Sequence, residues 1–405
     1  MTQDGHCPPN WVFAVLHMPY GVCNGFFTIT LGFLLAKAGV STQAIAGIAA
    51  LCLFPLTWSV VWAPVVDFTL SYRAWYVIGT AATALGIALA GLLPAQGSSL
   101  LLLDLLAFAT SLATTFTGQV TAAFATHAEE GKKGDAAGWF MAGSIGGIGL
   151  GGGLGLWLAH HVAQLSWLAG LVLGLLCLSC CGALVMVREP AHAHRAPRLL
   201  STISNIWRDV VGLARSRRGI LAFVLLLLPM GTGAAANLWS AVAGDWKAGA
   251  DLVALATGVA GGAFSVVGAL AMGRLCDRFG AKSSYLVGAA VMGVILLAMA
   301  AAPRSPAMFS VFTLAYALSN GAMYASFAAV MLEAIGTACA ATKAPIMICL
   351  TNIPILAITL SDGQAQAMFG SGGMLVSEAA ISFAAIAVFA GFAALTRPRP
   401  ALAMS

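Results

Sequence analysis

The chain has 405 residues, of which 60% are hydrophobic and only 8% are Asp, Glu, Lys or Arg. In soluble domains about a quarter of all residues are charged, so this composition excludes a water-soluble globule and a disordered polar chain. Nearly all of the nine cysteines fall in or beside apolar runs rather than in loops, so a disulfide-stapled secreted domain is not indicated. Of these classes of protein, the composition is compatible with a polytopic membrane protein.

Twelve apolar stretches are bounded by charges or turn residues. An apolar helix of about 20 residues crosses the hydrocarbon core of a bilayer, so we predict one transmembrane helix in each stretch. They cover residues 12–36, 43–63, 75–94, 98–127, 138–160, 165–187, 220–243, 251–272, 284–302, 306–332, 345–361 and 374–395. No span is expected to be strongly broken.

The 19 Lys and Arg residues predict the orientation. With both termini in the cytoplasm, all but Lys37, Lys247 and Arg304 fall in inner loops or the tail. Cytoplasmic loops retain positive charge, so we predict a multi-pass protein of the plasma (inner) membrane with both termini cytoplasmic. The net charge of +5 therefore reflects topology, and membrane lipid rather than nucleic acid is the expected partner.

The stretch 188–219 carries seven of these cations and separates the first six spans from the last six. We predict an N-terminal six-helix bundle over 1–187, a cytoplasmic linker over 188–219 and a C-terminal six-helix bundle over 220–405. Apolar residues recur at helical spacing between 199 and 214. This pattern is compatible with an amphipathic helix on the membrane surface and equally with a solvated connector.

A short motif occurs at corresponding places in the two halves. Gly273–Lys282 follows the eighth span, and residues 62–67 follow the second. Both place an acid, Asp277 or Asp67, four residues after a small residue. The first copy is degenerate, because Ala63 replaces the glycine and no basic residue follows Asp67 directly.

The motif resembles the cytoplasmic signature of the major facilitator superfamily, in which a Gly, an Asp, a basic residue and a second Gly recur at this spacing. The resemblance implies an all-α integral membrane fold of 12 transmembrane helices in two pseudo-symmetric six-helix bundles. An acid at a helix end can pair with a base in one conformation and lose it when the halves rock. Asp67, Asp277 and Arg278 are therefore gating candidates, and a static turn with surface charges is the alternative.

The first two spans are most similar to one branch of that superfamily, which contains the AmpG-type muropeptide permeases, the acetyl-CoA transporters and some siderophore permeases. The similarity lies in Met18–Gly21, Lys37–Gln43 and Trp62–Pro64 with Asp67. It implies import of fairly large, often anionic solutes. No Lys or Arg lies inside a span to hold a carboxylate or phosphate, which argues against an anionic substrate.

In the superfamily, spans 1, 4, 7 and 10 line the central cavity. The resemblance therefore implies a substrate-binding role for the polar side chains of these spans, which recur at helical spacing on spans 1 and 10. They are His17, Tyr20, Asn24, Gln119, Asn237, Tyr316, Asn320 and Tyr324. Hydrogen bonding between helices is the alternative role for each.

Proton coupling needs a group that changes charge during the cycle, and His17 and Asp104 are the candidates within spans. Asp251, Asp362 and Glu378 lie at expected outer span ends, where we interpret them as solvated caps. Because no acid-rich cluster is visible, facilitated diffusion remains open.

Eight glycines between 143 and 155 include a G-x-G-x-x-G pattern, but no strand precedes it, so a nucleotide site is not expected. Small residues let helices approach closely, and we expect span 5 to pack on span 8 at Gly258 and Gly262. Cys177, Cys180 and Cys181 lie in an apolar span without a second ligand pair, so no metal and no cofactor are expected.

These observations predict a monomeric secondary active transporter that imports a small-molecule organic solute, such as a muropeptide, peptide or siderophore, with protons as a candidate coupling ion. The alternatives are a facilitated-diffusion or efflux carrier and a non-transporting assembly or receptor protein with the same fold. An enzyme is not expected, because no metal-ligand cluster and no paired base and nucleophile are visible near one membrane face.

Overall fold

The computed structural model describes residues 8–59, 69–126, 133–162, 167–187, 217–335 and 340–395, together with Val61, Val66, Glu189, Arg208 and Gly212. These residues form helices and short connections, without a strand in the described part of the chain. Eight of the described helices are long and apolar enough to cross a membrane, which supports a multi-pass membrane protein. The count of twelve spans stays a prediction.

The N-terminal helices follow the predicted stretches closely. They are α1 (Trp11–Gly25) continued through a π-helical turn into α2 (Gly32–Lys37), α3 (Thr42–Thr57), α5 (Tyr72–Leu92), α6 (Leu100–Thr126), α7 (Lys133–Gly149) continued into α8 (Gly155–His161), and α9 (Trp167–Ser179). Serine side chains start two of them, because Ser41 and Ser71 accept hydrogen bonds from the free amides of Ala44 and Ala74.

The C-terminal helices are less regular. They are α11 (Arg217–Leu227), α12 (Trp239–Val242), α13 (Ala250–Val253) continued through a π-helical turn into α14 (Ala260–Phe279), α15 (Ala281–Ala301), α16 (Pro306–Ile335) and α17 (Ala340–Leu395). The last is a pair of helices joined at Gly370, whose φ of 70° breaks the helical path. It covers the stretches predicted as spans 11 and 12.

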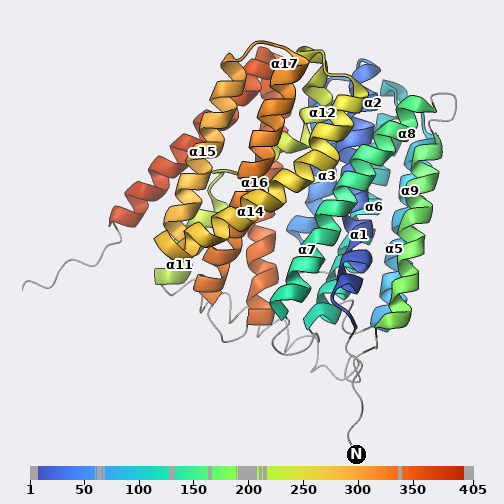
Figure 1. The fold of residues 1–405 in the computed structure, drawn as a ribbon, viewed down its shortest axis with the longest axis horizontal. Helices are drawn as coiled ribbons and strands as arrows, with labels where there is room; N and C mark the ends of the chain where they lie inside the picture. Colours follow the sequence, from blue (N-terminus) through green and yellow to red (C-terminus); the bar gives the residue numbers. More distant parts are fainter. Residues whose placement is uncertain are drawn as a thin grey trace, which may run out of the picture.

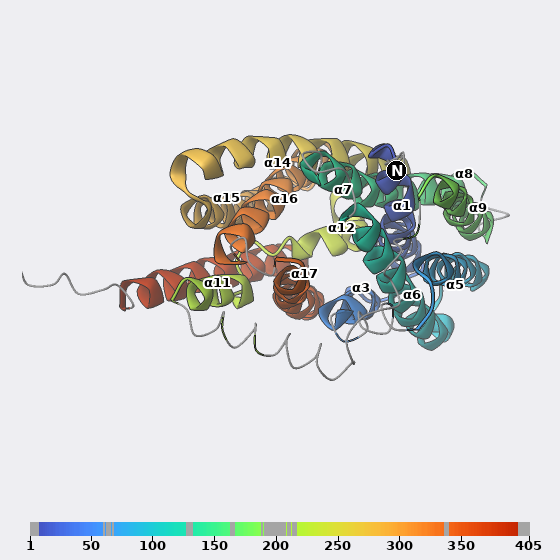
Figure 2. The ribbon, with the colours of Figure 1, turned by 90° about the horizontal axis from the view of Figure 1, so that it is seen from below.

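The N-terminal and C-terminal helices lie side by side along a common direction (Figure 1). We call the end of the bundle at which α1 begins the terminal face, and the end at which α2 finishes the far face. Figure 2 looks onto the terminal face and shows α12 near the centre, between α1 and the C-terminal helices α16 and α17.

Glycines bring α1 and α7 into backbone contact, as in many membrane bundles. A Cβ atom at Gly21 would overlap the carbonyl oxygen of Ser144, and one at Gly147 would overlap that of Met18. Part of the glycine-rich stretch of span 5 therefore serves packing within the N-terminal helices.

Gly149 and Gly153 of span 5 face span 8, as the sequence predicts. A Cβ atom at Gly258 would lie 3.2 Å from the Cα atom of Gly153, and one at Gly262 would lie 3.0 Å from Ile145. The expected contact of span 5 with span 8 is confirmed, and it joins the two groups of helices through small residues.

The seventh span is broken, which corrects the expectation that no span is strongly interrupted. α11 ends at Leu227, and residues 228–238 run through turns and a short 3-10 helix before α12 begins. Pro229 lacks an amide hydrogen, and Gly231 and Gly233 adopt φ values of 59° and 74° that favour glycine. We call residues 228–238 the break.

Candidate functional site

His17 and Tyr20 lie together on α1. The imidazole of His17 is buried, and it stacks on the rings of Phe140 and Tyr20 at centroid distances of 3.6 and 4.8 Å. Gly118 of α6 leaves room for both rings, since a Cβ atom there would lie 3.5 Å from His17. The Nδ1 atom of His17 has no hydrogen-bond partner among the described residues.

Asn24 lies one turn further along α1 and lines a small pocket between α1, α3 and α6. Its backbone oxygen accepts a hydrogen bond of 2.8 Å from Thr28. The pocket is bounded by Tyr20, Cys23, Asn24, Cys52, Leu56, Ser111 and Thr114. Side chains of three helices therefore converge beside Asn24 around a space of water-molecule size.

The two other candidates of the fourth span are not part of this group. Gln119 donates a hydrogen bond of 2.7 Å to the carbonyl oxygen of Ser59, which ties α6 to the end of α3. Asp104 is half-buried near the far-face end of α6, close enough to Cys52 for an electrostatic interaction. The structure thus separates Asp104 from His17, the other predicted proton carrier.

The three candidates on α16 contact three different partners. The hydroxyl of Tyr316 donates to Glu378, and the Tyr316 ring meets that of Trp239 edge-on at 5.2 Å. The amide of Asn320 packs against Gly233 in the break. Tyr324 is 51% exposed and lies near enough to Tyr20 for an electrostatic interaction. The electrostatic interaction of Tyr20 with Tyr324 joins residues of the two groups of helices, without a hydrogen bond or ring contact between these two described side chains.

Side chains of the neighbouring C-terminal helices satisfy the backbone of the break. The hydroxyl of Tyr285 lies 3.5 Å from the Met230 oxygen, and the amide of Gly231 donates a 3.2 Å hydrogen bond to Ser382. At the other end, the candidate Asn237 donates a 3.0 Å hydrogen bond to Thr359. Unwound backbone inside a membrane protein requires such partners, because lipid offers none.

Asp362 and Glu378 are buried, which corrects their interpretation as solvated caps. Their exposed fractions are 0% and 4%, and they lie on the two parts of α17. Sequence reasoning missed them because Asp362 precedes a polar run, Gly363–Gln366, that resembles a loop. Glu378 carried a signal, because apolar residues follow it for several turns.

The gating candidates are only partly described. Asp67 and the side chain of Asp277 lie outside the described residues. Arg278 is exposed in the last turn of α14, with its guanidinium 5.3 Å from the ring centre of Phe279. Gly280 of the motif ends α14 with a φ of 83°, which explains why this position takes glycine.

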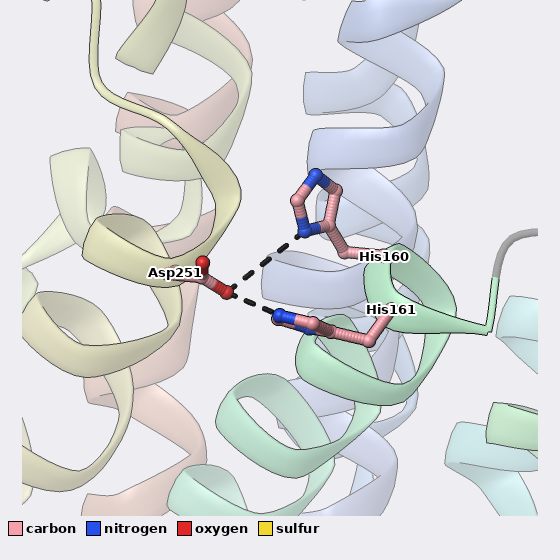
Figure 3. A group of neighbouring side chains, drawn as sticks. All are labelled: His160, His161 and Asp251. Carbon is pink, nitrogen blue, oxygen red and sulfur yellow. Dashed lines mark ion pairs between the residues drawn. The ribbon is translucent and has the colours of Figure 1, made fainter.

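At the far face, side chains from the two groups of helices meet (Figure 3). The Nδ1 atoms of His160 and His161 lie 3.9 and 3.7 Å from one carboxylate oxygen of Asp251. His160 and His161 end α8, whereas Asp251 begins α13. Their ligand atoms lie within 4.8 Å of one another, so this group could hold a divalent transition metal.

Further contacts close the far face. Ser240 of α12 donates a hydrogen bond of 2.6 Å to the carbonyl oxygen of Thr28 on the first span. Gly363 on α17 packs against Ala46 of α3. The described structure therefore has the first, second and fifth spans in contact with the seventh, eighth and eleventh near this face.

Comparison with known proteins points to one family. A sequence profile described as the Major Facilitator Superfamily matches residues 13–352. No curated protein sequence matches the chain.

Solved structures share the fold. A crystal structure of the nucleoside transporter NupG superposes with a TM-score of 0.72 at 12% identity, covering 96% of this chain and 99% of that one. A POT family transporter in complex with a thioalcohol-conjugated peptide superposes with a TM-score of 0.70 at 11% identity, covering 96% of each chain. At such identities the similarity concerns the fold alone.

Proposed function

Because this chain belongs to the major facilitator superfamily of membrane transporters, we propose that it imports an organic solute by alternating access, driven by a proton gradient. The proposal is supported by polar side chains in both groups of helices: Asn24 and Tyr20 line a small pocket on the N-terminal side, and Asn320 packs against the break on the C-terminal side. A site shared by two groups of helices can be opened to either side when they rock against each other.

The chemistry of these residues indicates the solute class. Phenol rings and amides offer stacking surfaces and both donors and acceptors of hydrogen bonds. No Lys or Arg stands in the middle of the predicted spans to pair with an anion. We therefore expect a neutral or zwitterionic solute, with muropeptides, peptides and siderophores as first candidates, and nucleosides added because of the solved nucleoside transporter of the same fold.

The proposed substrate contacts are those on the faces of spans 1, 4, 7 and 10. His17, Tyr20 and Asn24 serve from the first span, Gln119 from the fourth and Asn237 from the seventh, with Tyr316, Asn320 and Tyr324 from the tenth. His17 and Asp104 are proposed to respond to protons, and Asp67, Asp277 and Arg278 to act in gating at the terminal face.

The orientation of the two faces is proposed from the distribution of Lys and Arg. If the terminal face is cytoplasmic, as the distribution of Lys and Arg predicts, the far face is the external face and is closed in this structure. The direction, import, is taken from the resemblance of the first two spans to a branch of importers.

The test is a melting-temperature screen of purified protein against nucleosides, short peptides, anhydromuropeptides and siderophores. A solute at 100 times its dissociation constant should stabilise the protein by about 2.7 kcal/mol. Asn24→Ala and Asn320→Ala should each abolish the shift, whereas Ser179→Ala, on an exposed position of α9, should retain it.

Uptake into proteoliposomes completes the test. A solute that shifts the melting temperature should accumulate inside when the exterior is more acidic. Stabilisation without accumulation under any gradient would contradict transport and favour a receptor role. Accumulation that stops at equal concentrations would contradict proton coupling and favour facilitated diffusion.

A further inference from the structure

Two carboxyl groups are buried together in the C-terminal helices. Asp362 is 0% and Glu378 4% exposed, and the two interact electrostatically. Neither forms an ion pair within the described part of the chain. Both oxygens of Asp362 and the Oε2 atom of Glu378 lack a hydrogen-bond partner among the described residues.

The two carboxyls lie at matching depths. Asp362 precedes Gly370 by eight residues and Glu378 follows it by eight. At a rise of 1.5 Å per residue, each lies about 12 Å from Gly370, where α17 turns back at the far face. The hydrocarbon core is about 30 Å thick, so the pair lies near its middle.

Charge balance requires at least one proton on this pair. Two carboxylates in contact repel each other, and burial without a cation adds the cost of desolvating both. A proton on Asp362 removes one charge and supplies an O–H donor that can bond to the free oxygen of Glu378. A single shared proton therefore accounts for Oε2 of Glu378 and for one of the two oxygens of Asp362.

The neighbours of the pair distinguish the two carboxyls. Tyr316 donates a hydrogen bond of 3.0 Å to Glu378, and Thr232 and the backbone amide of Ala235 interact with Glu378 electrostatically. These donors suit a carboxylate, whereas Asp362 has none of them and suits the protonated acid. A metal ion would need oxygen ligands in their place, so the donor set favours a proton over a metal cation.

We propose that Asp362 and Glu378 form the site that binds and releases the coupling proton, and that the bound proton stabilises the conformation in which the far face is closed. This inference rests on the proposed proton-driven transport and adds to His17 and Asp104 a second proton site, in the C-terminal helices. Proton binding forms one O–H bond on the pair, release breaks it, and no other group is oxidised, reduced or transferred.

The link from the pair to the far face runs through the break. Ser382, one turn beyond Glu378, accepts a hydrogen bond of 3.2 Å from the amide of Gly231, and Glu378 itself interacts electrostatically with Thr232 and Ala235 of the break. The break leads directly into α12, whose Ser240 bonds to Thr28 of the first span. Removing the proton charges both carboxyls and pushes apart the two parts of α17, which loosens the elements that hold α12 against the first span.

Among the side chains that the structure describes, the titratable groups around the pair offer no counter-charge. Elements packed against α17 contribute Cys52, Lys282, Tyr285, Tyr316 and Tyr324. Of these, Tyr316 contacts the pair and Tyr285 lies against Met230. Arg304 lies near Gly372, but its guanidinium stacks over Trp246 at 4.0 Å. The side chains of Arg217, Arg218 and Glu333, on α11 and α16, lie outside the described residues.

The first experiment needs no solute. Hydrogen–deuterium exchange of the purified full chain in lipid nanodiscs is followed at low and high pH, with rates corrected for the intrinsic pH dependence. Peptides covering α2, α12 and α13 should exchange about tenfold faster at the higher pH in the natural protein, which corresponds to about 1.4 kcal/mol. Asp362→Asn and Glu378→Gln, which mimic the protonated forms, should remove this response, whereas Asp245→Asn, at an exposed acid on the 3-10 helix Ala243–Trp246, should retain it.

The second experiment uses proteoliposomes and the solute found by the melting-temperature screen. Asp362→Asn and Glu378→Gln should lose at least tenfold of the uptake driven by a pH gradient. They should keep exchange of labelled for unlabelled solute, which requires no net proton movement. Gel filtration and melting temperature establish that each variant is folded.

The outcomes separate this inference from the proposed function. If the natural protein takes up no solute under any gradient, the proposed function fails, while the exchange experiment still tests proton binding by the pair. If gradient-driven uptake persists in both variants, the pair is not the coupling site and proton-driven transport stands. If sodium at constant pH, rather than protons, closes the far face in the natural protein but not in the variants, the proton assignment is overturned.

Discussion

The hydroxyl of Tyr316 donates a hydrogen bond of 3.0 Å to Oε1 of Glu378, joining α16 to the second part of α17. Tyr316 is also packed edge-on against Trp239, which begins α12 directly after the break. A side chain predicted to contact the solute is thus bonded to a buried carboxylate, so solute and proton would act on neighbouring groups.

Replacing Tyr316 by Phe removes this hydrogen bond and leaves the ring in place. Hydrogen bonds to charged groups contribute about 1.5–3 kcal/mol, so we expect proton affinity of the pair to rise and gradient-driven uptake to fall about tenfold. The pH dependence of uptake measures this, and its midpoint should move to higher pH. Tyr285→Phe, whose 3.5 Å contact with the Met230 oxygen is long, is the control; an equal loss in both would contradict a specific role for Tyr316.

Gly233→Ala tests the break. The φ of 74° disfavours a side chain, and a Cβ atom would overlap the Asn320 amide, so we expect loss of most solute binding or transport. The strain alone should cost about 1–3 kcal/mol, measurable as a lower melting temperature. Gly244→Ala is the matched control, because nothing lies within 4 Å of its Cβ position and its φ is negative. Full activity of Gly233→Ala would show that the break tolerates regular geometry.

Gly21→Ala tests the packing of α1 on α7. The new methyl would overlap the Ser144 carbonyl oxygen, and backbone cannot move aside as a flexible side chain can. Overpacking costs about 1–3 kcal/mol, so the melting temperature in detergent should fall. Gly47→Ala on α3 meets nothing within 4 Å and should be neutral or stabilising, since alanine favours the helix. Equal behaviour of the two variants would contradict the close approach.

Zinc ions test the contact of His160 and His161 with Asp251. Zinc bonds of about 2.0–2.1 Å place tetrahedral ligands about 3.3 Å apart, a small contraction from the observed 3.7 and 3.9 Å. Binding must displace the 3.1 Å contact of His161 Nδ1 with the Trp157 oxygen. Zinc at 100 times its dissociation constant should add about 2.7 kcal/mol of stability and slow uptake, and chelation should reverse both effects.

The controls for zinc are single substitutions on either side of the contact. His160→Ala and Asp251→Asn should each abolish the zinc effect, and basal uptake should change less than fivefold because exposed ion pairs contribute about 1 kcal/mol or less. Zinc inhibition that survives Asp251→Asn would place the metal elsewhere.

The sequence alone determined the membrane class, the family resemblance and the positions of most helices. Long apolar runs have few alternatives to helix in lipid, since each backbone group must be paired within its own segment. It also predicted the contact of span 5 with span 8, because glycines at four-residue spacing indicate where helices can approach. The break, in retrospect, had a local signal in Pro229, Gly231 and Gly233.

Tertiary structure alone decided which polar residues meet. Asp362 and Glu378 lie on opposite sides of the kink at Gly370. Only the return of α17 on itself brings their carboxyls together beside Tyr316. Hydropathy placed both acids at span ends, since it reports the average of a window and not the neighbours of one side chain. Burial of a charge is a property of the assembled bundle, and so is the contact of His161 with Asp251, whose residues are ninety positions apart.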